Sequence, residues 1–213
     1  MNLRPVRAMV KPVVFAACLA PALMLMAGAF GVERFALGAD PVARLLHSCG
    51  LWALRFLMIT LAITPLRDLT GSVQWLRYRR MLGLFAFFYV ALHFSVYLLL
   101  DQSGKLGALW QDIVKRPYIT IGMLGFVLLI PLALTSTAKA MRRLGRRWTT
   151  LHRAVYLIAI LGVWHFWWQV KKDIREPLLY AAILSILLGY RLWKRLKVRS
   201  RLSVGRTAGT HAA

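Results

Sequence analysis

The chain has 213 residues, of which 59% are hydrophobic and 17% are charged, and its mean hydropathy is +0.59. A soluble domain is closer to half apolar and a quarter charged, so the composition excludes an ordinary soluble protein and indicates an integral membrane protein. The formal net charge of +22 could suggest nucleic acid, but the basic residues lie mainly between and after apolar blocks. Membrane topology accounts for that pattern, so we expect lipid around the chain and no nucleic-acid partner.

Apolar blocks recur along the chain, and about 20 helical residues are enough to cross the hydrocarbon core of a bilayer. The pattern predicts an all-α integral membrane protein with a bundle of six transmembrane helices. One membrane domain is expected over residues 1–199, and a disordered cytoplasmic tail over 200–213. The six helices are expected at about 13–30, 44–64, 81–100, 118–137, 148–169 and 177–193.

The first block is the one that could be a targeting segment. Arg4, Arg7 and Lys11 precede it, and the run from Ala27 to Ala29 is similar to a signal-peptidase site. The block is long for a signal segment, however, and Pro21 interrupts it. We therefore expect a retained first helix.

Lysine and arginine are distributed unevenly over the segments that join the blocks. They are concentrated in the N-terminal segment, in residues 65–80 and 138–147, and after Tyr190. Cytoplasmic segments of membrane proteins carry an excess of these residues, so both termini are predicted to be cytoplasmic.

Two histidines lie at similar predicted depths on different helices. His93 follows Arg80 by about 20 Å along the third helix, and His165 lies near the far end of the fifth. Either histidine alone would be read as a hydrogen-bonded core residue. A depth-matched pair of imidazoles across a helical bundle instead favours axial ligation of a haem iron.

His152 and Arg55 are further candidates for cofactor contacts. His152 lies near the inner end of the fifth helix, but the third helix has no histidine at that depth to complete a second haem. A flavin, a quinone, a haem propionate or plain interfacial polarity are the alternatives for His152. Arg55 lies in the middle of the second block, where an unpaired charge is costly, so it should face a partner or water. A haem propionate or another anionic cofactor group fits, and the alternative is that its side chain extends to the membrane surface.

At these positions the chain resembles the MsrQ family, also called YedZ, of haem-binding membrane subunits. The resemblance covers nearly all of residues 10–195, and its pieces are specific when taken together. They are WALRFLMITLAITPLR (52–67), RRMLGLFAFFYVALHFSVY (79–97), KRPYITIGMLG (115–125), LALTS (132–136) and WTTLHRAVYL (148–157), with His165 following.

The MsrQ family belongs to the ferric-reductase-like transmembrane domains, which include the membrane part of NADPH oxidases. In those oxidases the third and fifth helices each carry two haem-ligand histidines. Here the fifth helix keeps His152 and His165, whereas the third keeps only His93. The resemblance implies one b-type haem bound by His93 and His165, and His152 is the uncertain ligand of a second.

The resemblance also implies FMN and a location in the bacterial cell inner membrane as a multi-pass protein. Electrons would come from the quinone pool or a cytosolic flavin reductase. They would pass to a periplasmic MsrP-type molybdopterin reductase that repairs methionine sulfoxide in oxidised proteins. The chain would then be an electron-transfer subunit without its own substrate turnover. The alternatives are a stand-alone ferric reductase, a quinol-linked b-type cytochrome or, in another class, a proton-coupled transporter or membrane assembly factor.

Overall fold

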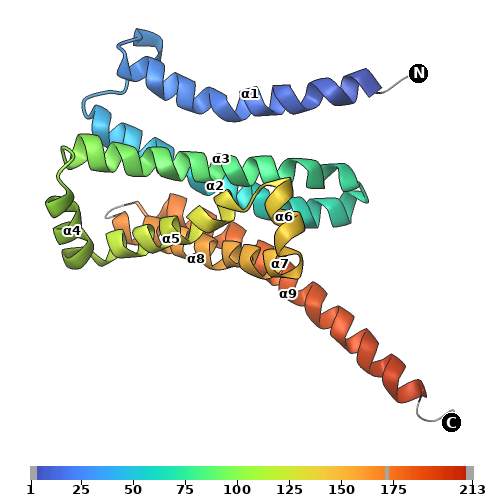
Figure 1. Ribbon diagram of the computed structural model, residues 1–213. Coiled ribbons are helices and arrows are strands. Elements are labelled where there is room, and N and C mark those ends of the chain that lie inside the picture. The colour runs from blue at the N-terminus through green and yellow to red at the C-terminus, as the bar shows by residue number, and fades with distance from the viewer. Residues whose placement is uncertain (1–3, 171–172, 210–213) are drawn as a thin grey trace.

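The computed structural model describes residues 4–170 and 173–209, and this part of the chain is helical and contains no strand (Figure 1). The short helices η1 (Glu33–Phe35) and η2 (Val73–Trp75) precede α2 and α3, and a π-helix, η3 (Tyr97–Asp101), extends α3. The main helices are α1 (Arg4–Ala29), α2 (Pro41–Thr70), α3 (Leu76–Val96), α4 (Leu106–Lys115), α5 (Pro117–Leu134), α6 (Ala138–Leu144), α7 (Arg146–His152), α8 (Ala154–Gln169) and α9 (Arg175–Gly209).

The prediction of an all-helical membrane protein is confirmed. Four stretches of the described residues are long and apolar enough to cross a membrane: Val10–Ala29, Pro41–Thr70, Val73–Asp101 and Pro117–Leu134. The helix boundaries follow local chemistry. Asp40 caps α2 by accepting a hydrogen bond from the backbone N–H of Ala43 at 3.0 Å, and Gly71 ends it with a φ of 66°.

Two antiparallel helix pairs form the centre of the bundle. α2 packs along α3, and α5 packs along α8, while α1 lies against α3 and α9 lies against α8 and α2 (Figure 1). Both pairs run between the same two ends of the molecule. We call the end with residues 31–40 and α4 the α4 end, and the opposite end, with η2 and α6, the α6 end.

α1 is fastened to the bundle by Tyr89 of α3, which is fully buried. The tyrosine hydroxyl accepts from the backbone N–H of Ala22 at 3.0 Å and donates to the carbonyl of Cys18 at 2.9 Å. These two groups would otherwise bond to each other within the helix, so the hydroxyl is inserted into the hydrogen-bond ladder of α1. Pro21 lies inside the same turn.

Two segments differ from the sequence-based expectation. The fifth predicted block divides into α7 and α8 at Arg153. There the backbone hydrogen bonds join residues three apart, as in a 3-10 turn: Arg153 N–H donates to the carbonyl of Thr150 at 3.2 Å, and Tyr156 N–H donates to that of Arg153 at 3.1 Å. Residues 200–209, for which a disordered tail was expected, continue α9 as helix. Residues 210–213 of the expected tail lie outside the described residues.

Candidate functional site

His93 lies in α3 with its ring against the backbone of α2. Its Nδ1 is 2.9 Å from the main-chain carbonyl of Leu46, and Gly50, one turn further along α2, lies directly beside the ring. A carbonyl oxygen can only accept a hydrogen bond, so Nδ1 carries the proton. The other ring nitrogen, Nε2, therefore keeps its lone pair and can act as a metal ligand.

His165 is held in the same way on the other helix pair. Its Nδ1 is 2.7 Å from the main-chain carbonyl of Tyr118 at the start of α5, and Gly122 lies one turn further along that helix. The same argument assigns the proton to Nδ1 and leaves the lone pair on Nε2. The two helix pairs thus each contribute one imidazole whose Nε2 is unprotonated and can bind a metal ion.

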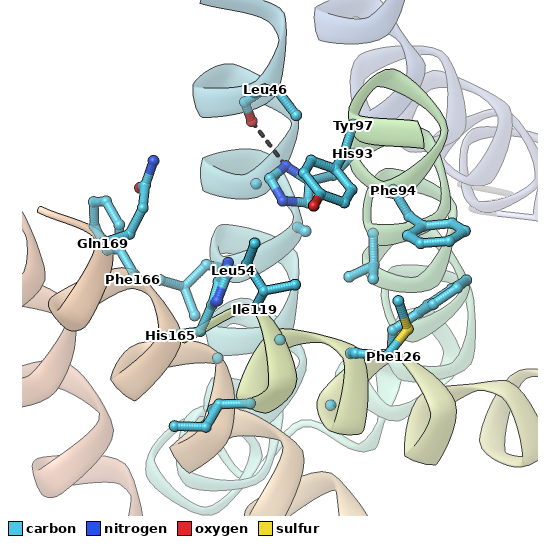
Figure 2. A pocket seen from close by; sticks show the side chains of 18 of the residues that line it. Leu46, Leu54, His93, Phe94, Tyr97, Ile119, Phe126, His165, Phe166 and Gln169 are labelled. Carbon is cyan, nitrogen blue, oxygen red and sulfur yellow. Dashed lines mark hydrogen bonds between the residues drawn. The ribbon is translucent and has the colours of Figure 1, made fainter. Parts of the chain in front are cut away.

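The two rings lie in one cavity of about 330 Å³ between the helix pairs (Figure 2). Their centres are 6.2 Å apart, and their planes are inclined by 83°. An imidazole nitrogen binds a first-row metal ion at about 2.0 Å and lies about 1.1 Å from its ring centre, so two rings on opposite sides of one ion are about 6 Å apart. The separation of His93 and His165 fits one shared metal ion.

The donor set also indicates which kind of metal site the two histidines could form. No group of three or more His, Cys, Asp or Glu side chains that could hold a metal ion occurs among the described residues. An ion between His93 and His165 would take its remaining ligands from a cofactor or from water. A haem iron fits, because its macrocycle supplies the in-plane nitrogens and leaves the axial positions to the protein. The walls are mostly apolar, as the lining residues Leu54, Leu57, Val90 and Leu129 illustrate.

A polar network that no sequence pattern predicted forms the rim of the cavity at the α4 end. The hydroxyl of Tyr97 donates to Asp112 at 2.7 Å, and the guanidinium of Arg116 pairs with the other oxygen of the same carboxylate at 3.2 Å. Both Tyr97 and Arg116 line the cavity. Only the position of Arg116, just before Pro117 at the start of a predicted helix, could have pointed to it. A cation at this rim can contact an anionic group of a bound cofactor.

His152 lies outside this cavity, near the α6 end. Its Nε2 is 3.0 Å from the hydroxyl oxygen of Thr135, and the indole of Trp148 stacks on its ring with centres 3.9 Å apart. The same indole donates its N–H to the carbonyl of Thr135 at 3.0 Å. The structure therefore groups His152 with a hydroxyl and an indole, and does not bring it together with His93 and His165.

Arg55 does not line the cavity either. Its Nε donates to the hydroxyl of Tyr180 in α9 at 3.0 Å, and its guanidinium lies over the ring of Trp52 at 4.8 Å. These contacts give the charge protein partners within the membrane region. The cofactor contact expected for Arg55 stays a prediction.

A second polar cluster lies near the α6 end, between α2 and α9. Asp68 accepts from Lys194 at 2.5 Å, from Arg67 at 2.7 Å and from the hydroxyl of Tyr190 at 3.1 Å. Arg191 donates to the carbonyl of Leu61. Sequence patterns did not reveal this cluster, because α2 and α9 are more than 100 residues apart in the chain.

Comparison with known proteins shows the family of this chain. Residues 49–163 match the family described as ferric reductase like transmembrane component. A protein of Xanthomonas campestris pv. campestris (strain 8004), "Protein-methionine-sulfoxide reductase heme-binding subunit MsrQ", is 58% identical over 84% of this chain and 79% of its own length. Proteins with the same name from Xanthomonas euvesicatoria pv. vesicatoria (56% identity; 89% of this chain, 88% of the relative) and Brucella anthropi (53%; 81% and 78%) also match.

The chain belongs to the MsrQ family of ferric-reductase-like transmembrane proteins. No solved structure matches it.

Proposed function

We propose that this chain is a b-type haem protein that carries electrons across the bacterial inner membrane, with His93 and His165 as the axial ligands of one haem. The observation that carries the proposal is the pair of imidazoles 6.2 Å apart in one apolar cavity. Relatives named as haem-binding subunits support it. A bound haem supplies a one-electron carrier.

The residues of the chain itself prepare the site for that carrier. The carbonyls of Leu46 and Tyr118 hold the Nδ1 proton of each imidazole and leave each Nε2 for the iron. The apolar walls exclude water, and the guanidinium of Arg116 offers a positive charge at the rim for a propionate.

Six transmembrane helices with both termini in the cytoplasm form part of this proposal. α8 packs along α5 and against α2, and α9 packs against α8 and α2. Both run between the same two ends of the bundle, which supports counting them as the fifth and sixth spans (Figure 1). The lysine and arginine excess at the α6 end supports a cytoplasmic α6 end. The Tyr89 contact to α1 supports a retained first helix, because cleavage after Ala29 would remove both backbone partners of its hydroxyl.

The electron acceptor that we propose is a periplasmic MsrP-type molybdopterin reductase, which would use the electrons to repair methionine sulfoxide in oxidised periplasmic proteins. The support is the name of the relatives, which places them in a methionine-sulfoxide reductase. The chain would be the electron-transfer subunit, without its own substrate turnover. The donor would be the quinone pool or a cytosolic flavin reductase acting at the α6 end.

His152 belongs to the entry half of this proposal. Its hydrogen bond to Thr135 and its stacking on Trp148 support a role beside a donor or a second cofactor rather than a role in the His93–His165 site. FMN, and a second haem, enter the proposal through the family resemblance alone.

A two-part experiment on the purified protein tests the proposal. A reduced-minus-oxidised spectrum should show b-type haem bands, and a protein without them would favour the transporter or assembly-factor alternative. The reduced protein is then mixed with a purified periplasmic methionine-sulfoxide reductase and a methionine sulfoxide substrate. We expect haem oxidation that depends on both additions. Oxidation by ferric iron chelates together with no response to the reductase would favour a stand-alone ferric reductase.

A further inference from the structure

The two cavity histidines are held by the same arrangement, in which the Nδ1 of each ring faces a backbone carbonyl of the paired helix. In α2 and α3 the carbonyl belongs to Leu46 and the histidine follows 47 residues later; in α5 and α8 the carbonyl belongs to Tyr118 and the spacing to the histidine is again 47. In each case a glycine, Gly50 or Gly122, follows the carbonyl residue by four positions. The repetition relates the two helix pairs, although no internal sequence repeat is evident.

The place of the glycine has a physical reason. Each Cα–Cβ bond of an α-helix tilts toward the N-terminus, so a side chain lies over the turn that precedes it. A side chain at position 50 or 122 would therefore cover the carbonyl one turn earlier, at Leu46 or Tyr118. Glycine leaves that carbonyl open to an imidazole from the neighbouring helix.

The distances from an added Cβ to its neighbours show that there is little room for a side chain at either glycine. A Cβ at Gly122 would lie 2.8 Å from the ring of His165, and a Cβ at Gly50 would lie 3.2 Å from the ring of His93. Helical glycines elsewhere do not meet a histidine: a Cβ at Gly83 or Gly125 would have its nearest neighbour at 3.8 Å, and a Cβ at Gly28 would clash with the backbone carbonyl of Phe35. Close helix packing alone therefore does not account for Gly50 and Gly122, which contact the histidine rings themselves.

We propose that Gly50 and Gly122 are positioning residues for haem ligation, each of which lets one imidazole donate its Nδ1 proton to a helix carbonyl and thereby fixes the rotation of that ring. This inference rests on the proposed function, in which His93 and His165 bind the iron. The ring planes that result are inclined by 83°. Near-perpendicular axial imidazoles give ferric low-spin haem one dominant large g value in electron paramagnetic resonance, whereas parallel rings give a rhombic signal.

The test compares Gly122→Ala and Gly50→Ala with the control variants Gly83→Ala and Gly189→Ala. A Cβ at Gly83 or Gly189 meets no histidine. Each full-length protein is purified in detergent, and its haem affinity, ferric resonance spectrum and midpoint potential are measured. For Gly122→Ala we expect a loss of haem affinity of about 10-fold or more, as is usual when the partner of a ligand histidine is disturbed, and shifted g values.

Gly50→Ala should change in the same direction by less, because its added methyl group has 3.2 Å rather than 2.8 Å of room. The two control variants should match the wild type. Wild-type haem affinity and wild-type g values in Gly122→Ala would overturn the inference. If Gly122→Ala aggregates on size exclusion, Gly50→Ala decides alone, and an unchanged spectrum there would also overturn it.

His165→Ala separates this inference from the proposed function. Full low-spin haem in His165→Ala would mean that the ligand assignment itself fails. Loss of the low-spin haem in His165→Ala, together with a Gly122→Ala protein that matches Gly83→Ala, would mean that only the positioning role of the glycines fails.

Discussion

The two ends of the bundle use histidine in different surroundings. Near the α4 end, His93 and His165 each bond through Nδ1 to a backbone carbonyl and share a cavity. Near the α6 end, His152 has its Nε2 on the hydroxyl of Thr135 and its ring against an indole. At the α4 end, Nε2 of each ring is therefore left for a metal ion. At the α6 end, Nε2 of His152 is already engaged in a hydrogen bond.

Under the proposed function, tautomer and ring contacts distinguish a metal ligand from a polar contact better than the presence of an imidazole in a membrane helix does. All three histidines are similar in the sequence, since each lies in or beside an apolar helix. Only His93 and His165 combine a carbonyl partner, a facing glycine and a second imidazole within 6.2 Å.

The largest expected effect comes from removing either ring of the cavity pair. His93→Ala or His165→Ala should lower the haem-to-protein ratio of the purified protein by about 10-fold or more, because one axial ligand is lost. Haem is quantified after extraction, and the monomer peak on size exclusion confirms folding. Normal haem content in both folded variants would remove the basis of the pairing.

His152→Ala should have a different and smaller effect. We expect the haem held by His93 and His165 to remain bound and reducible by dithionite, whereas reduction by the physiological donor becomes several-fold slower. The reason is that His152 lies near the α6 end and outside the cavity. Rapid mixing with a quinol or with the cytosolic flavin reductase measures the rate. A wild-type rate would leave His152 as an interfacial polar residue.

Thr135→Val tests the hydrogen bond between Thr135 and His152 by itself. The substitution removes the hydroxyl that lies 3.0 Å from His152 at nearly constant volume, so about 1 kcal/mol of hydrogen bonding is lost. Reduction by the donor should slow by less than in His152→Ala, and Thr135→Ser should keep the wild-type rate. Equal slowing in the valine and serine variants would show that the hydroxyl is not the group that matters.

Arg55→Leu should give the smallest change, a modest decrease in haem retention or electron transfer with normal membrane insertion. The charge is lost together with its bond to Tyr180, but leucine introduces no buried polar group. Tyr180→Phe is the matched control, since it removes the same bond and keeps the charge. Equal losses in both variants would assign Arg55 to the contact between α2 and α9, and wild-type behaviour in Arg55→Leu would leave it without a cofactor role.

The sequence predicted the helical membrane architecture well because long apolar runs have few alternative structures. It also predicted that His93 and His165 lie together, since counting helical rise places them at one depth. It could not predict the glycine contacts, because they depend on how α2 meets α3 and α5 meets α8. The partner of Arg55, Tyr180, is 125 residues away and carries no local signal. The break at Arg153 and the length of α9 depend on backbone hydrogen bonding that apolar periodicity does not encode.

Axial ligation by His93 and His165 is tested most directly by replacing one imidazole with a thioether. Histidine–methionine ligation raises the reduction potential of a haem relative to two histidines. We therefore expect His165→Met and His93→Met to bind haem with a midpoint potential more positive than that of the wild type, while His152→Met keeps the wild-type value for the same haem. Full haem content with an unchanged potential in both cavity variants, or a shifted potential in His152→Met alone, would contradict the account.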